Sequence, residues 1–412
     1  MQRRSCARRP LRGAGEELRF RVFRQHLIAT ACAALIALAA PANIEGAQAQ
    51  AQPVPERSTA TPQQALRTKL NDSTLLVATG RPSASYLGMA GDMAALLANG
   101  EEVRILPVAG AGGAQTLRDL LFLRGIDMAI VPSNVLAHAR ATEAMGGGLT
   151  QRVAYVTRLF AEEVHLLVGR GVASIEDLRG KQIGVPADDG TAQFTAEDLF
   201  GRLKFRVELV AANPADAIDK VRAGNLAAVL LVGGKPMPHL AGLPRDGSVR
   251  LLDLSFARSL DEAYSPAVLV ADDYPALVPP GQIVETLAVS PVLLTNSGRG
   301  SEESARRVAK VIPALFGGLS GLALADRHPK WRDVNIAASL PGWTRVAAAE
   351  EWLVKAKEQQ AGSLQKRFED FLRATRKPGS PDLSPAEQKR LFDEFVGWTR
   401  KSLGDASQSV SQ

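Results

Sequence analysis

Apolar runs alternate with polar, glycine-rich turns along this chain, a pattern that predicts strands each followed by a helix. Three such units follow one another: strand 75–79 with turn 80–86, strand 103–108 with turn 110–114, and strand 128–131 with turn 132–134. The first two turns each open a helix, which extends to Leu97 and to about Leu123 respectively. Ligands of open α/β sheets bind beyond the carboxyl ends of the strands, so the three turns predict one small-molecule site.

The pattern continues in the second part of the chain. Ser174 with Asp177 forms a capping box, and Asn213-Pro214 pairs a helix cap with a proline at the first helical position. The almost wholly apolar run 226–232 is typical of a strand buried on both faces. The further strands are expected at 163–168, 182–185, 283–290 and 292–295, with helices at about 191–205 and 302–319.

The segment from about Ala347 changes to a charged helical pattern, which Lys377-Pro378-Gly379-Ser380-Pro381 interrupts. Ser384, Pro385 and Glu387 mark the start of its second helix. Large apolar side chains recur at helical spacing: Trp352, Phe368, Phe371, Leu391, Phe392 and Trp398. Such stripes usually pack in a core, so we favour two helices packed on the globular body over a partner-binding appendage.

The formal charge of +6 is concentrated at the N-terminus. Residues 1–49 carry eight basic and three acidic residues, which leaves 41 basic and 40 acidic residues in the remainder. A nearly neutral remainder excludes nucleic acid as the expected partner. Arginines precede an apolar stretch, 27–40, that is short for a membrane span, and Ala47-Gln48-Ala49 resembles a cleavage site. We expect a cleaved signal peptide at 1–49; the alternative is an uncleaved anchor.

Cys6 and Cys32 both lie in this leader, so the remainder can form no disulfide and use no thiolate. The histidines are scattered without metal-ligand spacing, and no nucleophile motif occurs. Gln115 occupies the third glycine position of a dinucleotide fingerprint, which argues against an oxidoreductase. The sequence therefore predicts no metal, no cofactor and no catalytic residue. An enzyme on the same scaffold remains the rival hypothesis.

Several segments together resemble the TAXI family of TRAP-transporter solute receptors. They are the turns 80–86 and 112–117, the run 120–131, the run 160–168 and the run 175–181. The similarity covers roughly residues 73–345 and lies in the order and spacing of these segments. It implies a periplasmic receptor that presents a carboxylate-bearing solute, an amino acid or a dicarboxylate, to a TRAP-type membrane permease. A membrane-tethered ligand sensor or interaction protein is the alternative that uses the same fold.

The implied fold class is α/β, a two-lobed type II periplasmic binding protein with two crossing hinge strands and a C-terminal helical extension. The crossing strands are expected near 163–168 and 285–295. The expected boundaries are a signal peptide at 1–49, a flexible linker at 50–72, lobe 1 at 73–163 and 290–345, lobe 2 at 164–289, and the helical extension at 346–412.

The chain departs from the family where a hydroxyl-rich turn is usual. Asp188 and Asp189 stand there instead, and Gly113-Ala114 replaces a Gly-Ser pair in the first lobe. The two carboxylates either cap the following helix or meet a cationic group of the solute, and the sequence leaves both open. Ser83, Ser85, Ser133 and Asn134 likewise fit caps as well as ligand donors.

We expect the ligand-binding residues to lie on the turns of both lobes. The candidates are Arg81, Ser83, Ser85, Tyr86, Gly112, Gly113, Ala114, Gln115, Ser133, Asn134, Asp188, Asp189, Gly190, Thr191, Gly233, Gly234 and Lys235. Among them, Tyr86 would direct a hydroxyl to the solute and Arg81 could clamp a carboxylate. Lys235 fits a solvated turn lysine at least as well as a ligand contact.

Overall fold

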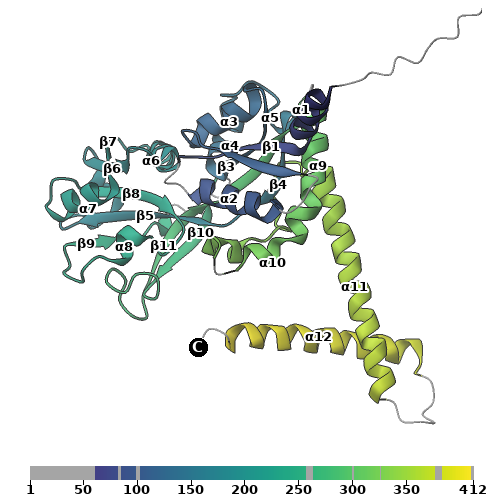
Figure 1. The fold of residues 1–412 in the computed structure, drawn as a ribbon. Coiled ribbons are helices and arrows are strands. Elements are labelled where there is room, and N and C mark those ends of the chain that lie inside the picture. Colours follow the sequence, from purple (N-terminus) through teal and green to yellow (C-terminus); the bar gives the residue numbers. More distant parts are fainter. Residues whose placement is uncertain are drawn as a thin grey trace, which may run out of the picture. The chain divides into compact units, whose positions relative to one another are not determined.

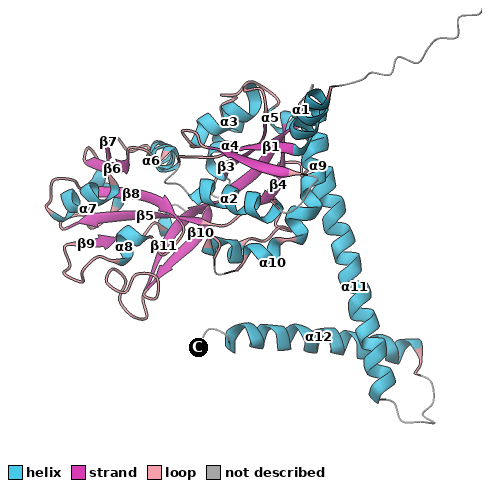
Figure 2. Ribbon diagram, viewed as in Figure 1, coloured by secondary structure: helices cyan, strands magenta, loops and turns pink. Residues whose placement is uncertain are grey.

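The computed structural model describes residues 61–81, 85–98, 103–256, 263–298, 301–324, 326–375 and 383–409 (Figure 1). The expected signal peptide and the candidate Ser83 lie outside these residues. The side chain of Trp398 does so too. The described chain contains two sheets, each with helices on its faces (Figure 2).

Five strands form the first sheet, in the order β2-β1-β3-β12-β4. β1 is parallel to both of its neighbours, whereas β12 is antiparallel to β3 and β4. All side chains of β3 are buried, as expected for a central strand covered on both faces. The strands are β1 (Thr74–Ala78), β2 (Arg104–Val108), β3 (Ile126–Pro132), β4 (Val153–Arg158) and β12 (Pro291–Asn296).

Seven strands form the second sheet. Six follow the order β10-β11-β5-β8-β6-β7, and β9 pairs with β5 off this path. β6 is parallel to β7 and β8, while β5 is antiparallel to β8 and β11. The strands are β5 (Glu162–Gly169), β6 (Gln182–Pro186), β7 (Glu208–Ala212), β8 (Ala228–Gly233), β9 (Val249–Leu251), β10 (Ser265–Val270) and β11 (Ile283–Val289).

The chain passes between the two sheets twice. It leaves β4 of the first sheet and enters β5 of the second through residues 159–161, and it returns from β11 to β12 through Ser290 alone. We call the first sheet with its helices lobe 1 and the second sheet with its helices lobe 2. This is the α/β, two-lobed type II periplasmic binding-protein fold with C-terminal helices, so the expected fold class is confirmed.

The helices follow the strands as the pattern predicts. Asn213 caps its helix by accepting from Ala215 N, and Ser174 with Asp177 completes the expected capping box. The lobe 1 helices are α2 (Ser85–Leu97), α3 (Gly113–Phe122), α4 (Ser133–Ala141), α5 (Leu149–Arg152), α9 (Glu302–Gly317), α10 (Leu319–Leu322) and η3 (Pro329–Asp333). Those of lobe 2 are η1 (Ile175–Leu178), α6 (Gly190–Arg202), α7 (Pro214–Arg222) and α8 (Pro238–Ala241).

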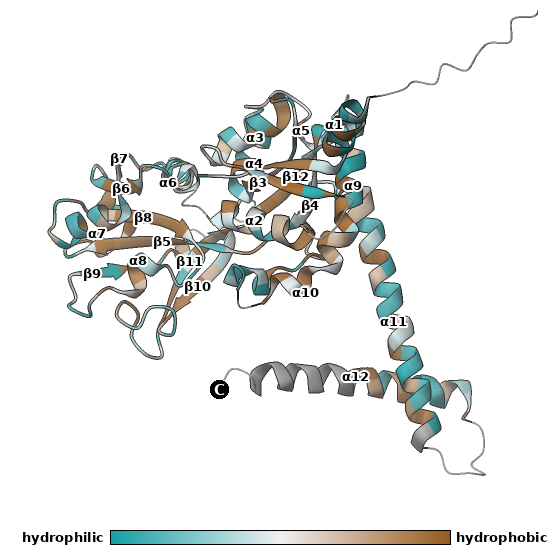
Figure 3. Cartoon of the chain, viewed as in Figure 1, coloured by the Kyte–Doolittle hydropathy of each residue, from teal (hydrophilic) through white to brown (hydrophobic). Residues whose placement is uncertain are grey.

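Each sheet separates two apolar clusters, because successive side chains of a strand point to opposite faces. On β1, Leu75 and Val77 join one cluster and Ala78 joins the other. On β5, Leu166 and Leu167 divide in the same way between the clusters of lobe 2. Figure 3 shows the apolar character of β5 and β8. Each buried Leu or Val contributes about 1.5–3 kcal/mol relative to an exposed one.

A buried ion pair fixes α9 to the first sheet. Asp127 on β3 is buried, and its Oδ1 lies 2.6 Å from Nη2 of Arg307. The other oxygen of Asp127 accepts from the backbone N of Leu76 on β1 at 3.0 Å. One carboxylate therefore joins two strands and a helix. A partner is required there, because an isolated buried carboxylate is strongly unfavourable.

Part of the segment expected to be a flexible linker is helical. Helix α1 (Pro62–Ser73) begins at a capping box between Thr61 and Gln64, with proline at its first turn. None of its residues is buried. The helix is therefore stabilised locally, by caps that the composition of the segment obscured. Residues 50–60 of that expected linker lie outside the described residues.

The C-terminal aromatic residues divide between two environments. Helix α11 (Ala347–Thr375) places Ala349 and Trp352 in a lobe 1 cluster, where Trp352 packs edge-on against Phe316. Phe368, further along α11, packs instead on Phe392 of α12 (Pro385–Ser409), at 5.3 Å between ring centroids. Only the start of α11 thus packs as the sequence pattern indicated, and the later aromatic residues join the two helices.

We predict that Arg307→Ala lowers the free energy of unfolding by about 3–5 kcal/mol, because it leaves the Asp127 carboxylate buried without its cation. Urea denaturation measures the change. The neighbouring Arg306 is exposed and provides a matched control, for which Arg306→Ala should stay within about 0.5 kcal/mol. Equal losses for both variants would contradict the role given to the ion pair.

Candidate functional site

A cavity of about 420 Å³ lies at the carboxyl ends of strands from both lobes. Lobe 1 contributes the start of α2, and lobe 2 contributes the turns after β6, β7 and β8. This is the position at which open α/β sheets bind ligands. The lining residues are Ser85, Tyr86, Glu162, Pro186, Asp188, Asp189, Thr191, Asn213, Pro214, Leu231, Val232, Gly233, Gly234, Met237, Pro238 and His239.

The inner end of the cavity is a hydrogen bond between the lobes. The hydroxyl of Tyr86, on α2, donates to Oε2 of Glu162 at 2.5 Å. Glu162 is the first residue of β5, directly after the first crossing. Tyr86 is 2 % exposed and Glu162 is 5 % exposed. The pair is therefore shielded from bulk water, and a solute that reaches it meets a polar group in an apolar surrounding.

Burial raises the pKa of Glu162 from 4.5 to about 8, and the hydrogen bond from Tyr86 offsets part of this rise. The neighbouring carboxylates Asp189 and Glu163 raise it further. Burial together with Glu162 also raises the pKa of the Tyr86 hydroxyl well above its ordinary value. At neutral pH the Glu162 carboxyl is therefore largely protonated until a cation compensates the cost of its charge.

Glu163 faces away from this pair, as the next residue of a strand must. Its Oε2 accepts from the backbone N of Lys235 at 3.0 Å, and its Oε1 lies 3.8 Å from Nζ of Lys330. Burial raises the pKa of Glu163, and Lys330 opposes that rise. The side chain of Lys330 also lies directly over Gly234, where any Cβ would collide with it.

Asp189 caps helix α6. Its Oδ1 accepts from the backbone N of Thr191 at 2.9 Å and of Ala192 at 3.1 Å. Burial raises the pKa of Asp189, and the two backbone donors lower it in part. Both Asp188 and Asp189 line the cavity. The capping role that the sequence left open is thus present, and it coexists with a place in the cavity wall.

The charge of the wall has one sign. Glu162, Asp188 and Asp189 are its acidic residues, and no lysine or arginine is among the described residues that line it. Leu231, Val232 and Met237 supply an apolar surface beside them. Such a wall suits a small solute with a protonated amine on an apolar body, and it repels a solute that carries only negative charge.

The glycine-rich turns of the two lobes touch through their backbones. A Cβ added to Gly113 would lie 2.8 Å from the carbonyl oxygen of Gly190. A Cβ added to Gly190 would lie 2.8 Å from that of Ala111. A small space of about 40 Å³ remains beside this contact, lined in part by Arg81 and Gly112. Glycine at both positions therefore permits the lobes to meet.

Nine of the described candidates from the sequence do not line the main cavity. Three of them lie elsewhere in the two lobes, and four lie at the contact of the glycine-rich turns: Arg81, Gly112, Gly113 and Gly190. Lys235 directs Nζ to Asp273 at 2.8 Å and to the carbonyl oxygen of Val268. Gln115 is exposed on α3, where it donates to Asp119. Ala114 packs against an apolar cluster of lobe 1.

Ser133 and Asn134, the candidates after β3, make contacts between the lobes. Asn134 is fully buried, and its Nδ2 donates to the hydroxyl of Thr195 on α6 at 2.9 Å. Ser133 Oγ donates to the carbonyl oxygen of Ala263 at 3.1 Å. His165 is buried, with its Nε2 2.8 Å from the hydroxyl of Tyr274.

Glu162, the most buried acid of the cavity wall, was not among the sequence candidates. It stands at the start of an apolar strand and belongs to no turn. The available signal was the pair of acids Glu162-Glu163 at the start of an otherwise apolar strand. Charged residues are rarely buried unless they are paired, so the pair indicated a specific interaction. Asn213, Pro214 and His239 were missed because they follow other strands of lobe 2.

Two further properties concern the described residues alone. They contain no cluster of three or more side chains able to hold a metal ion. None of their helices combines the length and the apolarity needed to cross a bilayer.

A family model matches residues 77–316, which is more than half of the chain. The chain belongs to the NMT1-like family. Its fold and this membership make it a solute-binding protein of a transporter rather than an enzyme. No curated protein matches its sequence.

Solved structures with related chain folds include periplasmic solute receptors. The alkanesulfonate-binding protein SsuA from Xanthomonas axonopodis pv. citri, bound to MOPS, is 19% identical over 68% of this chain and 83% of its own, with a TM-score of 0.38. The aliphatic sulphonate binding protein SsuA from Escherichia coli is 16% identical over 79% and 92%, with a TM-score of 0.37. A TctC solute binding protein from Polaromonas is 12% identical over 60% and 88%, with a TM-score of 0.36.

We predict that Glu162→Gln reduces the pH dependence of stability. The folded chain holds a proton on Glu162 between pH 4.5 and about 8 that the unfolded chain has released, so the free energy of unfolding falls as pH rises through this window. The fall is at most about 1.4 kcal/mol for each pH unit. Urea denaturation at pH 5, 6.5 and 8 should show a steeper decline for the unaltered protein than for Glu162→Gln.

The exposed Glu208 supplies the control for this experiment. Glu208→Gln should decline with pH as the unaltered protein does. If Glu162→Gln declines equally steeply, the Glu162 carboxyl is not the buried titrating group.

Proposed function

We propose that this protein is an exported receptor that captures a small amine-bearing solute between its lobes and delivers it to a membrane permease of the TRAP type. The observation that carries the solute class is the buried acid Glu162 with the half-buried acid Asp189 in the cavity wall, whose described lining residues include no lysine or arginine. An amino acid fits this wall. A dicarboxylate, the other solute that the TAXI resemblance implies, is disfavoured by the acidic wall.

The solute enters with its ammonium group toward the buried end. There the ammonium forms an ion pair with Glu162 and is also attracted by the carboxylate of Asp189. The apolar body lies against Leu231 and Met237, while the exposed His239 stands at the rim. Because the Glu162 pKa is raised to about 8, binding of a cation releases a proton from this carboxyl near neutral pH.

Capture depends on both lobes. We assign the first sheet with its helices to lobe 1 and the second sheet with its helices, from Glu162 at the start of β5, to lobe 2, with residues 1–49 as a signal peptide cleaved on export to the periplasm. A solute that contacts Tyr86 in one lobe and Asp188 in the other favours the closed arrangement over the open one. The permease would then recognise the closed receptor.

The first experiment is native mass spectrometry of the protein purified after export from its own cells. We expect loss of residues 1–49 and release of a primary-amine solute in near-equal amount. An intact leader would favour the membrane-tethered sensor instead. Release of a dicarboxylate would contradict the solute class, and turnover of the released compound would restore the enzyme hypothesis.

Asp189→Asn separates charge from capping, because asparagine caps a helix as well as aspartate does. We predict that this variant binds the released amine solute about tenfold more weakly, since a charge-assisted contact contributes about 1.5–3 kcal/mol. Isothermal titration calorimetry measures the affinity. Asp219→Asn, on an exposed carboxylate of α7, should bind as the unaltered protein does. Unchanged affinity in Asp189→Asn would remove Asp189 from the site.

Gly190→Ala tests the closure itself. The new methyl group would lie 2.8 Å from the carbonyl oxygen of Ala111 in the other lobe, so the lobes could no longer meet as they do here. Alanine otherwise favours helix α6. We predict unchanged thermal stability, weaker solute binding, and a larger radius of gyration in small-angle X-ray scattering with solute present.

Gly201, in the same helix, has no atom within 4 Å of an added Cβ and provides the matched control. Gly201→Ala should retain both the affinity and the scattering profile of the unaltered protein. Retention of both by Gly190→Ala as well would show that solute binding does not require this contact.

A further inference from the structure

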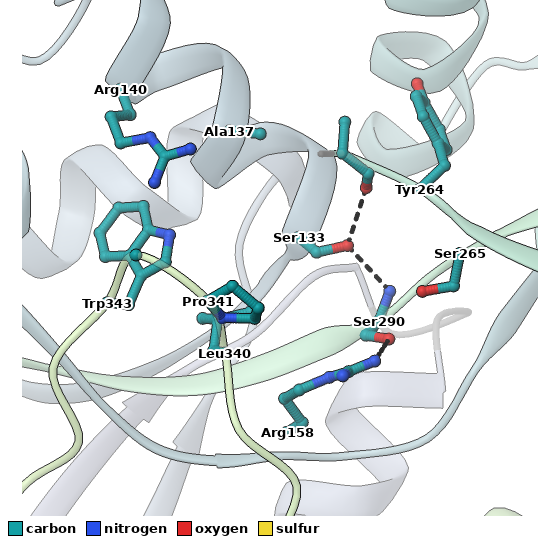
Figure 4. Close-up of a pocket in the computed structure, with 12 residues that line it drawn as sticks. Ser133, Ala137, Arg140, Arg158, Tyr264, Ser265, Ser290, Leu340, Pro341 and Trp343 are labelled. Atoms are coloured by element: carbon teal, nitrogen blue, oxygen red, sulfur yellow. Dashed lines mark hydrogen bonds between the residues drawn. The ribbon is translucent and has the colours of Figure 1, made fainter. Parts of the chain in front are cut away.

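A second cavity, of about 360 Å³, lies where the two lobes join (Figure 4). Lobe 1 contributes residues of α4, the end of β4 and the loop before α11, while lobe 2 contributes the chain that enters β10. The lining residues are Ser133, Ala137, Arg140, Arg158, Ala263, Tyr264, Ser265, Ser290, Leu340, Pro341, Gly342 and Trp343. None of them lines the acidic cavity.

Two arginines give this cavity a positive wall. Arg158 Nη2 donates to Oγ of Ser290 at 2.8 Å, and Nη1 donates to the carbonyl oxygen of Ser339 at 3.4 Å. The guanidinium of Arg140 lies 5.9 Å from the ring centroid of Trp343. Within the described part of the chain, neither arginine has a carboxylate in ion-pair range.

The acid that Tyr264 contacts, Asp198, is already compensated. Asp198 accepts from the hydroxyl of Tyr264 at 2.8 Å, and Figure 4 shows that hydroxyl directed away from Ser133. Asp198 also lies 2.7 Å from Nε of Arg202 and 3.5 Å from Nδ1 of His138. Its charge is therefore offset outside the cavity, and the two guanidinium groups determine the sign of the field within it.

The loop that carries Trp343 is held rigidly in place. Tyr155 N donates to the carbonyl oxygen of Thr344 at 3.0 Å, and the Tyr155 hydroxyl accepts from Leu340 N at 3.3 Å. Gly342 has a φ of +77°, and a Cβ there would collide with the guanidinium of Arg140. Glycine therefore allows the loop to turn beside Arg140, and the wall exists before any ligand binds.

We propose that this cavity is a second binding site, which takes a small organic anion held by the guanidinium groups of Arg140 and Arg158. The two guanidinium groups have no carboxylate partner among the described residues, and they match the planar, two-oxygen face of a carboxylate. Trp343, Leu340 and Tyr264 provide an apolar surface for the body of the anion. The site is independent of the acidic cavity, which excludes such a ligand by its charge.

The position of the site gives the anion a role in the hinge. Arg158 precedes the first crossing, and Ser290 forms the second, so the hydrogen bond between them joins the two connections of the lobes. A bound carboxylate contacts Arg158 at this point and faces Ser265 of lobe 2 across the cavity. Occupancy therefore changes how firmly the lobes are joined.

Titration of the full exported chain with benzoate and with inorganic sulfate tests the proposal, by calorimetry at low ionic strength and by the change in tryptophan fluorescence that Trp343→Phe removes. We expect saturable benzoate binding that is weakened about tenfold or more in Arg140→Ala and in Arg158→Ala. Sulfate should bind more weakly than benzoate, because it leaves the apolar wall uncovered. Arg118→Ala, on the exposed face of α3, removes equal charge and should bind benzoate normally.

Thermal unfolding shows whether each variant folds. Should Arg158→Ala fail to fold, Arg158→Lys retains the charge and loses the bidentate geometry, and it should still weaken benzoate binding. Sulfate binding as tight as benzoate would overturn the organic-anion assignment. The absence of saturable benzoate binding would overturn the site, as would benzoate affinity that Arg140→Ala and the folded Arg158 variant both leave unchanged.

Discussion

Within the described residues the chain connects its lobes at two places, and hydrogen bonds at Ser290 join these places to each other. Ser290 accepts from the backbone N of Ser133 at 2.9 Å, and its own backbone N donates to Ser133 Oγ at 3.1 Å. Its hydroxyl accepts from Arg158, the residue directly before the other connection. The second connection is therefore fixed on lobe 1. Any change in the angle between the lobes has to be absorbed by the residues on the lobe 2 side.

Two cavities of opposite charge lie near this junction. One presents Glu162 with Asp188 and Asp189, and the other presents Arg140 with Arg158. Fields of opposite sign discriminate between ligands before any detailed fit is tested, because the desolvation of a wrongly charged group is not compensated. One fold can thus present separate sites for cations and for anions without a change in its strands.

The strand-and-turn pattern and the local caps could be predicted from the sequence, because both depend on neighbours in the chain. Asn213 needs only Ala215 to cap its helix. The roles of distant side chains could not be predicted: the acid that engages Lys235 lies 38 positions away, at Asp273. The same limit applied to Glu162, whose importance depends on the hydroxyl of Tyr86, 76 positions earlier. The cavity wall was predictable where it consists of turns, and not where it depends on pairing across the fold.

The backbone contact between Gly113 and Gly190 limits which substitutions the sequence of this protein can accept during evolution. Most contacts between side chains tolerate an enlargement on one side if the other side becomes smaller. Here both partners already lack a side chain, so neither can shrink to accommodate the other. Compensation would require moving the turns of an entire lobe. A side chain at one of the two positions thus cannot be compensated by a substitution at the other. Variation in solute preference has to arise elsewhere in the cavity.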